Sequence, residues 1–98
     1  MTLEKDIERK LVKKVRQYGG WCLKWVCPGW AGVPDRIVLL PGGRIVFVEM
    51  KRLLGGQLME RQKWWGKTLI DLGFPYWAIW DECELETFEQ IELRRTEV

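Results

Sequence analysis

Apolar residues recur along the first 18 positions with the period of an amphipathic helix. The apolar positions recur every three or four residues, so they share one face of a predicted helix over residues 3–18. Gly19 and Gly20 follow directly and favour the end of the helix there. We expect the buried face of this helix to consist of Leu3, Ile7, Leu11, Val12, Val15 and Tyr18.

The middle of the chain has the pattern of β-strands. Residues 36–40 and 44–51 are rich in β-branched and apolar side chains, and the Pro-Gly-Gly sequence of residues 41–43 separates them, which predicts a β-hairpin. Residues 21–26 form a further, short strand candidate. Residues 27–33, which contain proline and glycine, connect this strand to the hairpin as a loop.

The second half of the chain predicts a helix followed by a strand. The helix extends over residues 57–72, and Gly73 and Pro75 favour its end. Residues 76–80 then return as a strand that a helical crossover makes parallel to its neighbour, and residues 84–95 are weakly helical. The order helix, strand, strand, strand, helix, strand indicates an α/β fold with a mixed central sheet flanked by helices. The apolar face of the second helix consists of Leu58, Trp65, Leu69 and Leu72.

The size and composition of the chain fit one globular domain. The chain has 98 residues and a mass of 11.7 kDa, with 47% hydrophobic and 31% charged residues. We expect a single domain over residues 1–98, with a core within about residues 3–80 and an acidic tail over residues 81–98. The sequence holds no run of about 20 apolar residues and begins without an apolar leader, so we expect an intracellular, cytoplasmic protein with no membrane partner.

Histidine and cysteine usage narrows the possible chemistry. The chain has no histidine, which excludes Ser-His and Cys-His catalysis and histidine-based zinc sites. The three cysteines, Cys22, Cys27 and Cys83, specify neither a four-ligand zinc site nor a disulfide framework, so we expect free thiols. Acid–base chemistry must therefore come from carboxylates, Lys, Tyr or Cys.

The net charge of +2 conceals an uneven distribution. Residues 1–80 carry 14 Lys and Arg against 7 Asp and Glu, whereas residues 81–98 carry 2 against 7. A basic body suits a polyanion such as nucleic acid, although solvated helix faces give the same balance. The candidates for phosphate contact are Lys13, Lys14, Arg36, Arg44, Arg52, Lys63 and Lys67. Trp30, Trp64 and Trp65 are candidates for an interface or for DNA contact, because seven Trp exceed what a small core hides.

Three polar residues fall on the apolar faces of the two predicted helices. Glu4 and Glu8 lie among the apolar residues of the first helix, and Gln62 lies within the apolar stripe of the second. An unpaired buried carboxylate is costly, so each should meet water, a cation or a metal. The alternatives are fraying of Glu4 into solvent, pairing of Glu8 with a lysine, and a satisfied core amide at Gln62.

Charged residues also end the predicted hairpin. Glu49 and Lys51 share the strand face that carries Phe47. A three-residue hairpin loop would place Asp35 opposite Glu49, whereas a two-residue turn would place it opposite Met50 and on the other face. We expect a bulge or an irregular strand start to turn Asp35 toward Glu49, and a salt bridge between Asp35 and Lys51 is the alternative.

These groups have the chemistry of a Mg²⁺ or Mn²⁺ site. Both ions prefer oxygen ligands, which Asp35, Glu49 and the backbone carbonyl that follows Glu49 could supply. Two carboxylates about 4 Å apart repel by roughly 4 kcal/mol at an effective dielectric constant of about 20, so a divalent cation would relieve strain. Lys51 could orient an attacking water or neutralise charge on a phosphate, while Glu8 could hold a second ion and Gln62 could fix Lys51 or the substrate. This combination points to phosphodiester hydrolysis.

The motifs on either side of the hairpin resemble those of a nuclease family. Gly32-Val-Pro-Asp35, followed after thirteen residues by Glu49-Met-Lys51, resembles the signature of the PD-(D/E)XK superfamily. Together with Glu8 in the first helix and Gln62 in the helix after the hairpin, these motifs resemble the virus-type replication-repair nuclease domain, VRR-NUC. The similarity spans about residues 3–80, and the segment that begins at Glu8 is also similar to the opening helix of archaeal Holliday-junction resolvases.

The resemblance implies a restriction-endonuclease-like αβββαβ core and Mg²⁺- or Mn²⁺-dependent cleavage of DNA. Stand-alone members of this type are similar to junction-resolving homodimers, so we expect a homodimer of viral or bacterial origin that acts in DNA repair on branched DNA, at four-way (Holliday) junctions. Two symmetric incisions require two sites related by a two-fold axis. The implied active-site positions are Glu8, Asp35, Glu49, Lys51 and Gln62, and the implied metal ligands are Glu8, Asp35, Glu49 and the backbone carbonyl of Met50.

Other functions remain compatible with the sequence. Within the enzymes, a restriction-type nuclease that reads base sequence is the alternative. A DNA-binding module without turnover would bind DNA in a salt-dependent way and release no products. A protein-interaction domain would use its tryptophan-rich surface and bind no DNA.

Overall fold

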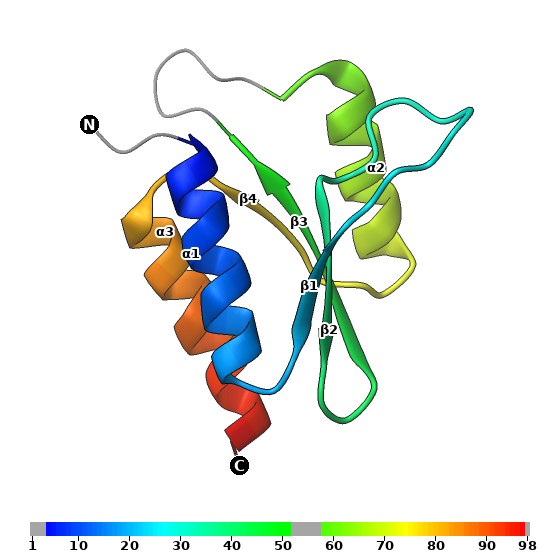
Figure 1. The fold of residues 1–98 in the computed structure, drawn as a ribbon. Helices are drawn as coiled ribbons and strands as arrows, with labels where there is room; N and C mark the ends of the chain where they lie inside the picture. The colour runs from blue at the N-terminus through cyan, green and yellow to red at the C-terminus, as the bar shows by residue number, and fades with distance from the viewer. Residues whose placement is uncertain (1–3, 52–57, 98) are drawn as a thin grey trace.

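The computed structural model describes residues 4–51 and 58–97, which form a sheet with helices on both faces (Figure 1). Two residues named in the sequence analysis lie outside the described residues: Leu3, which is predicted on the buried face of the first helix, and Arg52, which is a candidate for phosphate contact. The predicted order of elements is confirmed. The elements are α1 (Glu4–Gln17), β1 (Trp21–Lys24), β2 (Arg36–Leu40), β3 (Arg44–Met50), α2 (Glu60–Asp71), β4 (Tyr76–Ile79), α3 (Glu82–Phe88), the π-helical turn η1 (Glu89–Leu93) and the 3₁₀ turn η2 (Arg94–Glu97).

The four strands form one mixed sheet in the order β1-β2-β3-β4. The pairs β1–β2 and β2–β3 are antiparallel, and β4 pairs with β3 in parallel, as the crossover through α2 predicts. Helices α1 and α3 cover one face of the sheet, whereas α2 lies on the other (Figure 1). The predicted α/β class is therefore confirmed. In the described part of the chain, no helix is both long and apolar enough to span a bilayer.

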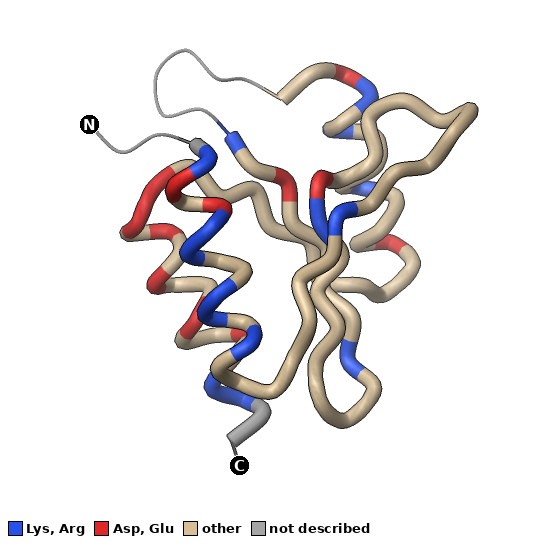
Figure 2. Tube along the Cα trace, in the orientation of Figure 1, with Lys and Arg blue, Asp and Glu red and all other residues tan. Residues whose placement is uncertain are grey.

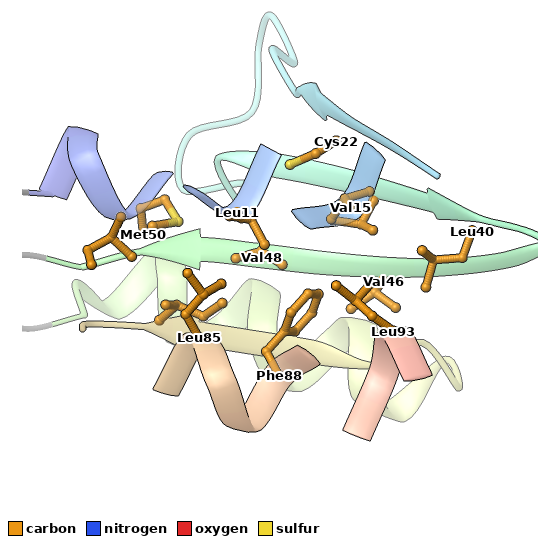
Figure 3. Close-up of a cluster of buried hydrophobic side chains, with 13 residues drawn as sticks. Leu11, Val15, Cys22, Leu40, Val46, Val48, Met50, Leu85, Phe88 and Leu93 are labelled. Carbon is orange, nitrogen blue, oxygen red and sulfur yellow. The ribbon is translucent and has the colours of Figure 1, made fainter. Parts of the chain in front are cut away.

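The main core lies between the sheet and the helices α1 and α3 (Figure 3). Ile7, Leu11 and Val15 of α1 are buried, which confirms the predicted face of this helix. Because side chains alternate along a strand, Val46 and Val48 of β3 point into the same core. The helix ends close to the sheet, where Gly20 lies so near Leu39 that a Cβ atom would stand 2.5 Å from the Leu39 carbonyl oxygen.

The acidic tail is part of this core, which corrects the predicted limit near residue 80. Leu85, Phe88 and Leu93 are buried in the same cluster as the residues of α1 (Figure 3). The tail is only weakly amphipathic in sequence, but it folds as α3 and η1 onto the sheet and closes the core from that side. Asp81 begins α3, and its side chain accepts a hydrogen bond of 2.9 Å from the backbone N–H of Glu84.

Most basic candidates for phosphate contact pair with carboxylates instead. Figure 2 shows basic positions of α1 beside acidic positions of α3. Lys10 pairs with Glu82, and the Lys14 Nζ lies 2.9 Å from Glu89 Oε1. The basic body and the acidic tail therefore neutralise each other in part across the helix interface. The other phosphate-contact candidates that form ion pairs do so as Arg44–Glu92 at 2.8 Å, Arg36–Glu8 at 2.7 Å, Lys63–Glu60 at 3.6 Å and Lys67–Asp71 at 2.8 Å.

The hairpin has the register of a three-residue loop. Arg36 pairs with Val48 and Leu40 pairs with Arg44. Gly42 and Gly43 adopt φ angles of 83° and 76°, which glycine accepts without steric strain and which close the loop. The same register extended by one residue places Asp35 opposite Glu49. The register alone already directs Asp35 toward Glu49, so no bulge is needed. Asp35 itself lies in a bend directly before β2 begins at Arg36, which agrees with the predicted irregular strand start.

Helix α2 is shorter than its predicted range of residues 57–72. It begins at Glu60 and ends at Asp71, and Leu72 is 67% exposed although the sequence predicts it on the buried face. Trp65 and Leu69 do face the sheet side, with Trp65 half-buried and Leu69 buried. Gly66 allows close approach to the sheet, because a Cβ atom there would stand 2.7 Å from the Tyr76 ring.

Candidate functional site

Asp35 is fixed at the start of β2 by the backbones of both neighbouring strands. Its Oδ2 accepts a 2.8 Å hydrogen bond from the backbone N–H of Met50 in β3. Its own carbonyl oxygen accepts a 3.0 Å hydrogen bond from the N–H of Trp25, which continues the β1–β2 ladder. The half-buried carboxylate is thus bound to the end of β3, next in sequence to Glu49.

Glu49 and Lys51 are two of the three buried charged residues in the described part of the chain. Glu49 is 2% exposed and Lys51 is 7% exposed. Alternation along β3 places both on the face of Phe47, toward α2. The N–H of Lys51 donates a 2.9 Å hydrogen bond to the carbonyl oxygen of Ile79, so the parallel pairing with β4 continues at this residue. Burying an acid and an ammonium in one place is costly, which favours a function for the pair.

Tyr76 is a member of this site that the sequence analysis missed. It pairs with Phe47 across β3 and β4, and so it lies on the same face as Glu49. Its hydroxyl is buried, with no hydrogen-bond partner among the described residues. Burial raises the pKa of Tyr76 to about 12, and the negative charges of Glu49 and Asp35 act in the same direction. Tyr76 therefore shares this face of the sheet with Glu49. The sequence signal that could have found it is its place as the first residue of the strand predicted to run parallel to its neighbour.

Glu8 does not join the two carboxylates in a shared ligand set. Its Oε2 accepts a 2.7 Å hydrogen bond from Arg36 Nε, so it pairs with an arginine and not with a lysine. Asp35 and Arg36 are successive residues of an extended chain and point to opposite faces of the sheet. Arg36 therefore turns to α1 and Glu8, while Asp35 turns to Glu49. Among residues 4–51 and 58–97, no three acidic or cysteine side chains are grouped closely enough to hold one metal ion, and a role of Glu8 as a metal ligand stays a prediction.

Gln62 takes part in the local structure of α2. Its Oε1 accepts a 2.8 Å hydrogen bond from the N–H of Met59, the residue before the helix. This bond satisfies one of the free N–H groups at the helix start. A contact of Gln62 with Lys51 or with a substrate stays a prediction. Glu4 lies at the start of α1, and its side chain lies outside the described residues.

The loop that carries Asp35 is packed directly on α2. Gly32 has a φ of 85°, and a Cβ atom at this residue would stand 2.6 Å from the Arg61 Cβ. Pro34 is fully buried, so the residue before Asp35 is also held in place. Trp65 Nε1 donates a 3.1 Å hydrogen bond to the carbonyl oxygen of Ala31. Residues 31–35 are therefore fixed between α2 and the sheet.

The donor set of this site fits a hard divalent cation. Asp35 and Glu49 supply two carboxylates, and the backbone carbonyl of Met50 is adjacent in sequence. Mg²⁺ is commonly held by one or two carboxylates and completes its coordination with waters and phosphate oxygens. This fit rests on the β2–β3 register, which, extended by one residue, places Asp35 opposite Glu49, and on the hydrogen bond from the Met50 N–H to Asp35 Oδ2. The three cysteines are free, as predicted, and take no part in it.

A comparison with solved structures identifies the fold of the chain. No protein-family model matches the sequence. A solved structure described as "VRR_NUC domain" superposes with a TM-score of 0.83 and 20% sequence identity, over 94% of this chain and 99% of that one. The chain has the fold of a VRR_NUC domain. The αβββαβ arrangement that the sequence resemblance implies is thus the fold observed in the structure.

A curated protein shares part of its sequence with the chain. "Putative nuclease p44" of Acyrthosiphon pisum secondary endosymbiont phage 1 is 56% identical over 48 residues. The match covers 49% of this chain and 52% of that protein, so the chain spans about half the length of this curated relative. The name of this phage protein describes it as a nuclease.

Proposed function

We propose that the chain is a metal-dependent endonuclease of the VRR-NUC family that hydrolyses phosphodiester bonds in DNA. The observation that carries the proposal is that the β2–β3 register places Asp35 opposite Glu49, on the face of the sheet that also holds the buried Lys51. Two acids and one ammonium in an enclosed place are the groups that metal-assisted phosphate hydrolysis needs. The VRR_NUC fold and the nuclease named as a phage relative support the same function.

Mg²⁺ or Mn²⁺ is the proposed cofactor. Asp35, Glu49 and the backbone carbonyl of Met50 would hold it. When bound, the cation supplies positive charge that stabilises the negative charge developing on the phosphate and activates water. The hydrogen bond from the Met50 N–H orients the Asp35 carboxylate and leaves its second oxygen available for such a ligand role.

The remaining predicted residues have distinct proposed roles. Lys51 would bring its ammonium to a phosphate oxygen or to the attacking water, where its charge stabilises the transition state. Gln62 would bind the substrate after leaving Met59. Glu8 would hold a second ion only after it separates from Arg36, because this arginine occupies its carboxylate.

We further propose a homodimer that cuts branched DNA, with the four-way junction as its preferred substrate. A chain of 11.7 kDa presents one such site, whereas symmetric incision of a junction needs two at a fixed separation. A two-fold dimer provides that separation. Light scattering of the purified chain should give twice the monomer mass, and a monomer at working concentrations would contradict this part of the proposal.

The decisive experiment compares four DNA substrates with one purified chain. Four-way junction, flap, duplex and single-stranded DNA are incubated with Mg²⁺, with Mn²⁺ and with EDTA. We expect paired symmetric nicks in the junction with either metal and none with EDTA. Cleavage of one duplex sequence alone would favour the restriction-type alternative, and salt-dependent binding without products would favour a DNA-binding module.

Two variants connect the cleavage to the proposed site. Asp35→Asn and Lys51→Ala should each lower the cleavage rate at least about 100-fold. Asp71→Asn is the matched control, because Asp71 is exposed at the end of α2 and pairs only with Lys67 among the described residues. Full cleavage by Asp35→Asn, or equal loss in the Asp71 control, would overturn the assignment of the site.

A further inference from the structure

A cluster of aromatic rings forms a cavity on the α2 side of the molecule. The cavity has a volume of about 310 Å³, near the lower end of ligand pockets. Trp30 is 61% exposed and Trp64 is 54% exposed, so two large apolar side chains face solvent here. We call this cavity the tryptophan slot; its lining residues are Gly29, Trp30, Ala31, Arg61, Trp64 and Trp65.

The rings of the tryptophan slot stand at steep angles to one another. The Trp30 ring meets the Trp65 ring at 82° with centroids 6.0 Å apart, and the Trp64 ring meets it at 86° and 5.1 Å. Trp65 is held from behind by Trp25, at 72° and 6.1 Å, and by its hydrogen bond to Ala31. Trp65 is therefore a fixed base of the slot, and Trp30 and Trp64 rise from it with their ring surfaces accessible.

Three basic residues and the acidic Glu60 lie at or beside the tryptophan slot. Arg61 lines it, and Lys63 and Lys67 lie beside Trp64 along the neighbouring surface of α2. Lys63 and Lys67 have carboxylate partners within α2, whereas Arg61 has no ion pair among the described residues. Aromatic rings next to cations form the combination that stacks bases and contacts phosphates of single-stranded nucleic acid.

The tryptophan slot is built from the same loop as the proposed active site. Trp30 and Ala31 belong to the loop that leads to Asp35, and Gly32 packs on Arg61 at the slot wall. In Figure 1 this loop, between β1 and β2, runs beside α2. The tryptophan slot and Asp35 are therefore joined by one short stretch of chain that is packed on α2.

We infer that the tryptophan slot binds one unstacked nucleobase of the DNA substrate next to the cleavage site, which rests on the proposed nuclease function. A paired base inside a duplex keeps its two faces covered by its neighbours, whereas an unpaired base at a branch or in a flap can insert between rings. The slot thereby favours DNA in which a base is unpaired or leaves its pair at the branch point, as a base at the centre of a four-way junction would have to do, while Arg61 contacts the adjoining phosphate. The stacking is independent of base identity, because every base offers a flat aromatic surface.

The test measures how strongly the chain prefers unpaired bases. Dissociation constants are determined in EDTA, without cutting, for a fork with unpaired thymidine arms and for a fully paired duplex of the same length. In Trp64→Ala, the ratio of the two constants should fall by about 5-fold to 150-fold, the range of one base–aromatic stack. Trp64→Tyr should restore part of it. Trp21→Ala is the matched control, because Trp21 is also 54% exposed but lies on β1.

Salt dependence separates stacking from charge. Trp64→Ala should leave the slope of log affinity against log salt unchanged, whereas Arg61→Ala should reduce it by about 0.7 on the single-stranded arms. An unchanged preference in Trp64→Ala would overturn the base-binding slot while leaving the nuclease proposal intact if the wild type still cuts with Mg²⁺. A wild type that binds no DNA would overturn both, and a dimer that Trp64→Ala converts to monomer would show that a second copy of the chain occupies the slot.

Discussion

The two faces of the sheet are built from different kinds of side chain. On the face of α1 and α3, aliphatic residues and Phe88 are fully buried, and the charged residues, the buried Glu92 among them, pair with one another. On the face of α2, aromatic rings meet at steep angles, an acid and a lysine are buried, and two tryptophans remain exposed.

This difference separates stability from function within one small chain. Apolar burial contributes roughly 25 cal/mol for each Å² removed from water, and the face of α1 and α3 uses it fully. The face of α2 gives up part of that stabilisation, because buried charges are costly and exposed Trp surface gains nothing. A local loss of stability of this kind is typical of functional sites, whose residues serve a metal ion or a substrate rather than the fold.

The largest expected effect concerns the core on the α1 and α3 face. Phe88→Ala should lower the free energy of unfolding by about 3–5 kcal/mol, because it leaves a cavity in the closed core. Trp64→Ala removes a larger side chain from the α2 face and should change it by less than about 1 kcal/mol. Urea unfolding measures both. Equal losses in the two variants would break the distinction between the faces.

Variants of the Glu8–Arg36 ion pair test whether Glu8 contributes to the stability of the α1 and α3 face or to the candidate site. Glu8→Gln should lower the free energy of unfolding by about 1–3 kcal/mol, because the largely buried Arg36 loses its charged partner. The double variant Glu8→Gln with Arg36→Met should recover part of this loss. Urea midpoints of the single and double variants decide the point, and an unchanged midpoint in Glu8→Gln would assign Glu8 to the site instead.

The smallest expected effect is a pH dependence at the border of the core. Hydrogen bonds from Lys14 and Tyr18, each 2.9 Å long, hold the pKa of Glu89 below its ordinary range. A carboxylate with a lowered pKa in the folded state stabilises the fold at neutral pH and loses this contribution as the pH falls through that pKa. Between about pH 7 and about pH 3, Glu89→Gln should lose less stability than the wild type, by under about 1 kcal/mol because solvent screens the pair. Parallel urea titrations that show identical losses would contradict it.

Local features of the sequence predict most of the fold. Helical periodicity before two glycines specifies α1, and the Pro-Gly-Gly sequence between two β-rich runs specifies the hairpin. The register was open, because that turn sequence is compatible with either a two-residue or a three-residue loop. The contribution of the acidic tail to the core was underestimated. Its three core residues, spread over residues 85–93, give only a weak helical pattern in the sequence, and their burial follows from packing on the sheet.

The candidate site was predictable where it depends on one hairpin and less so where it depends on distant elements. The sequence places Asp35 and Glu49 on facing strands, and the ladder accounts for their meeting. It could not give the partner of Glu8, because Arg36 is 28 residues away in the sequence and meets Glu8 only once α1 packs on the sheet. It also missed Tyr76, whose position follows only from the exact pairing of β4 with β3.

The central claim is that Asp35 and Glu49 form a divalent-cation site on the α2 face. Titration calorimetry with Mn²⁺ tests it without DNA, on the wild type, Asp35→Asn and Glu8→Gln. The account predicts saturable binding to the wild type, at least about 10-fold weaker binding to Asp35→Asn, and near wild-type binding to Glu8→Gln. No Mn²⁺ binding by the wild type, or equal affinity in Asp35→Asn, would contradict it.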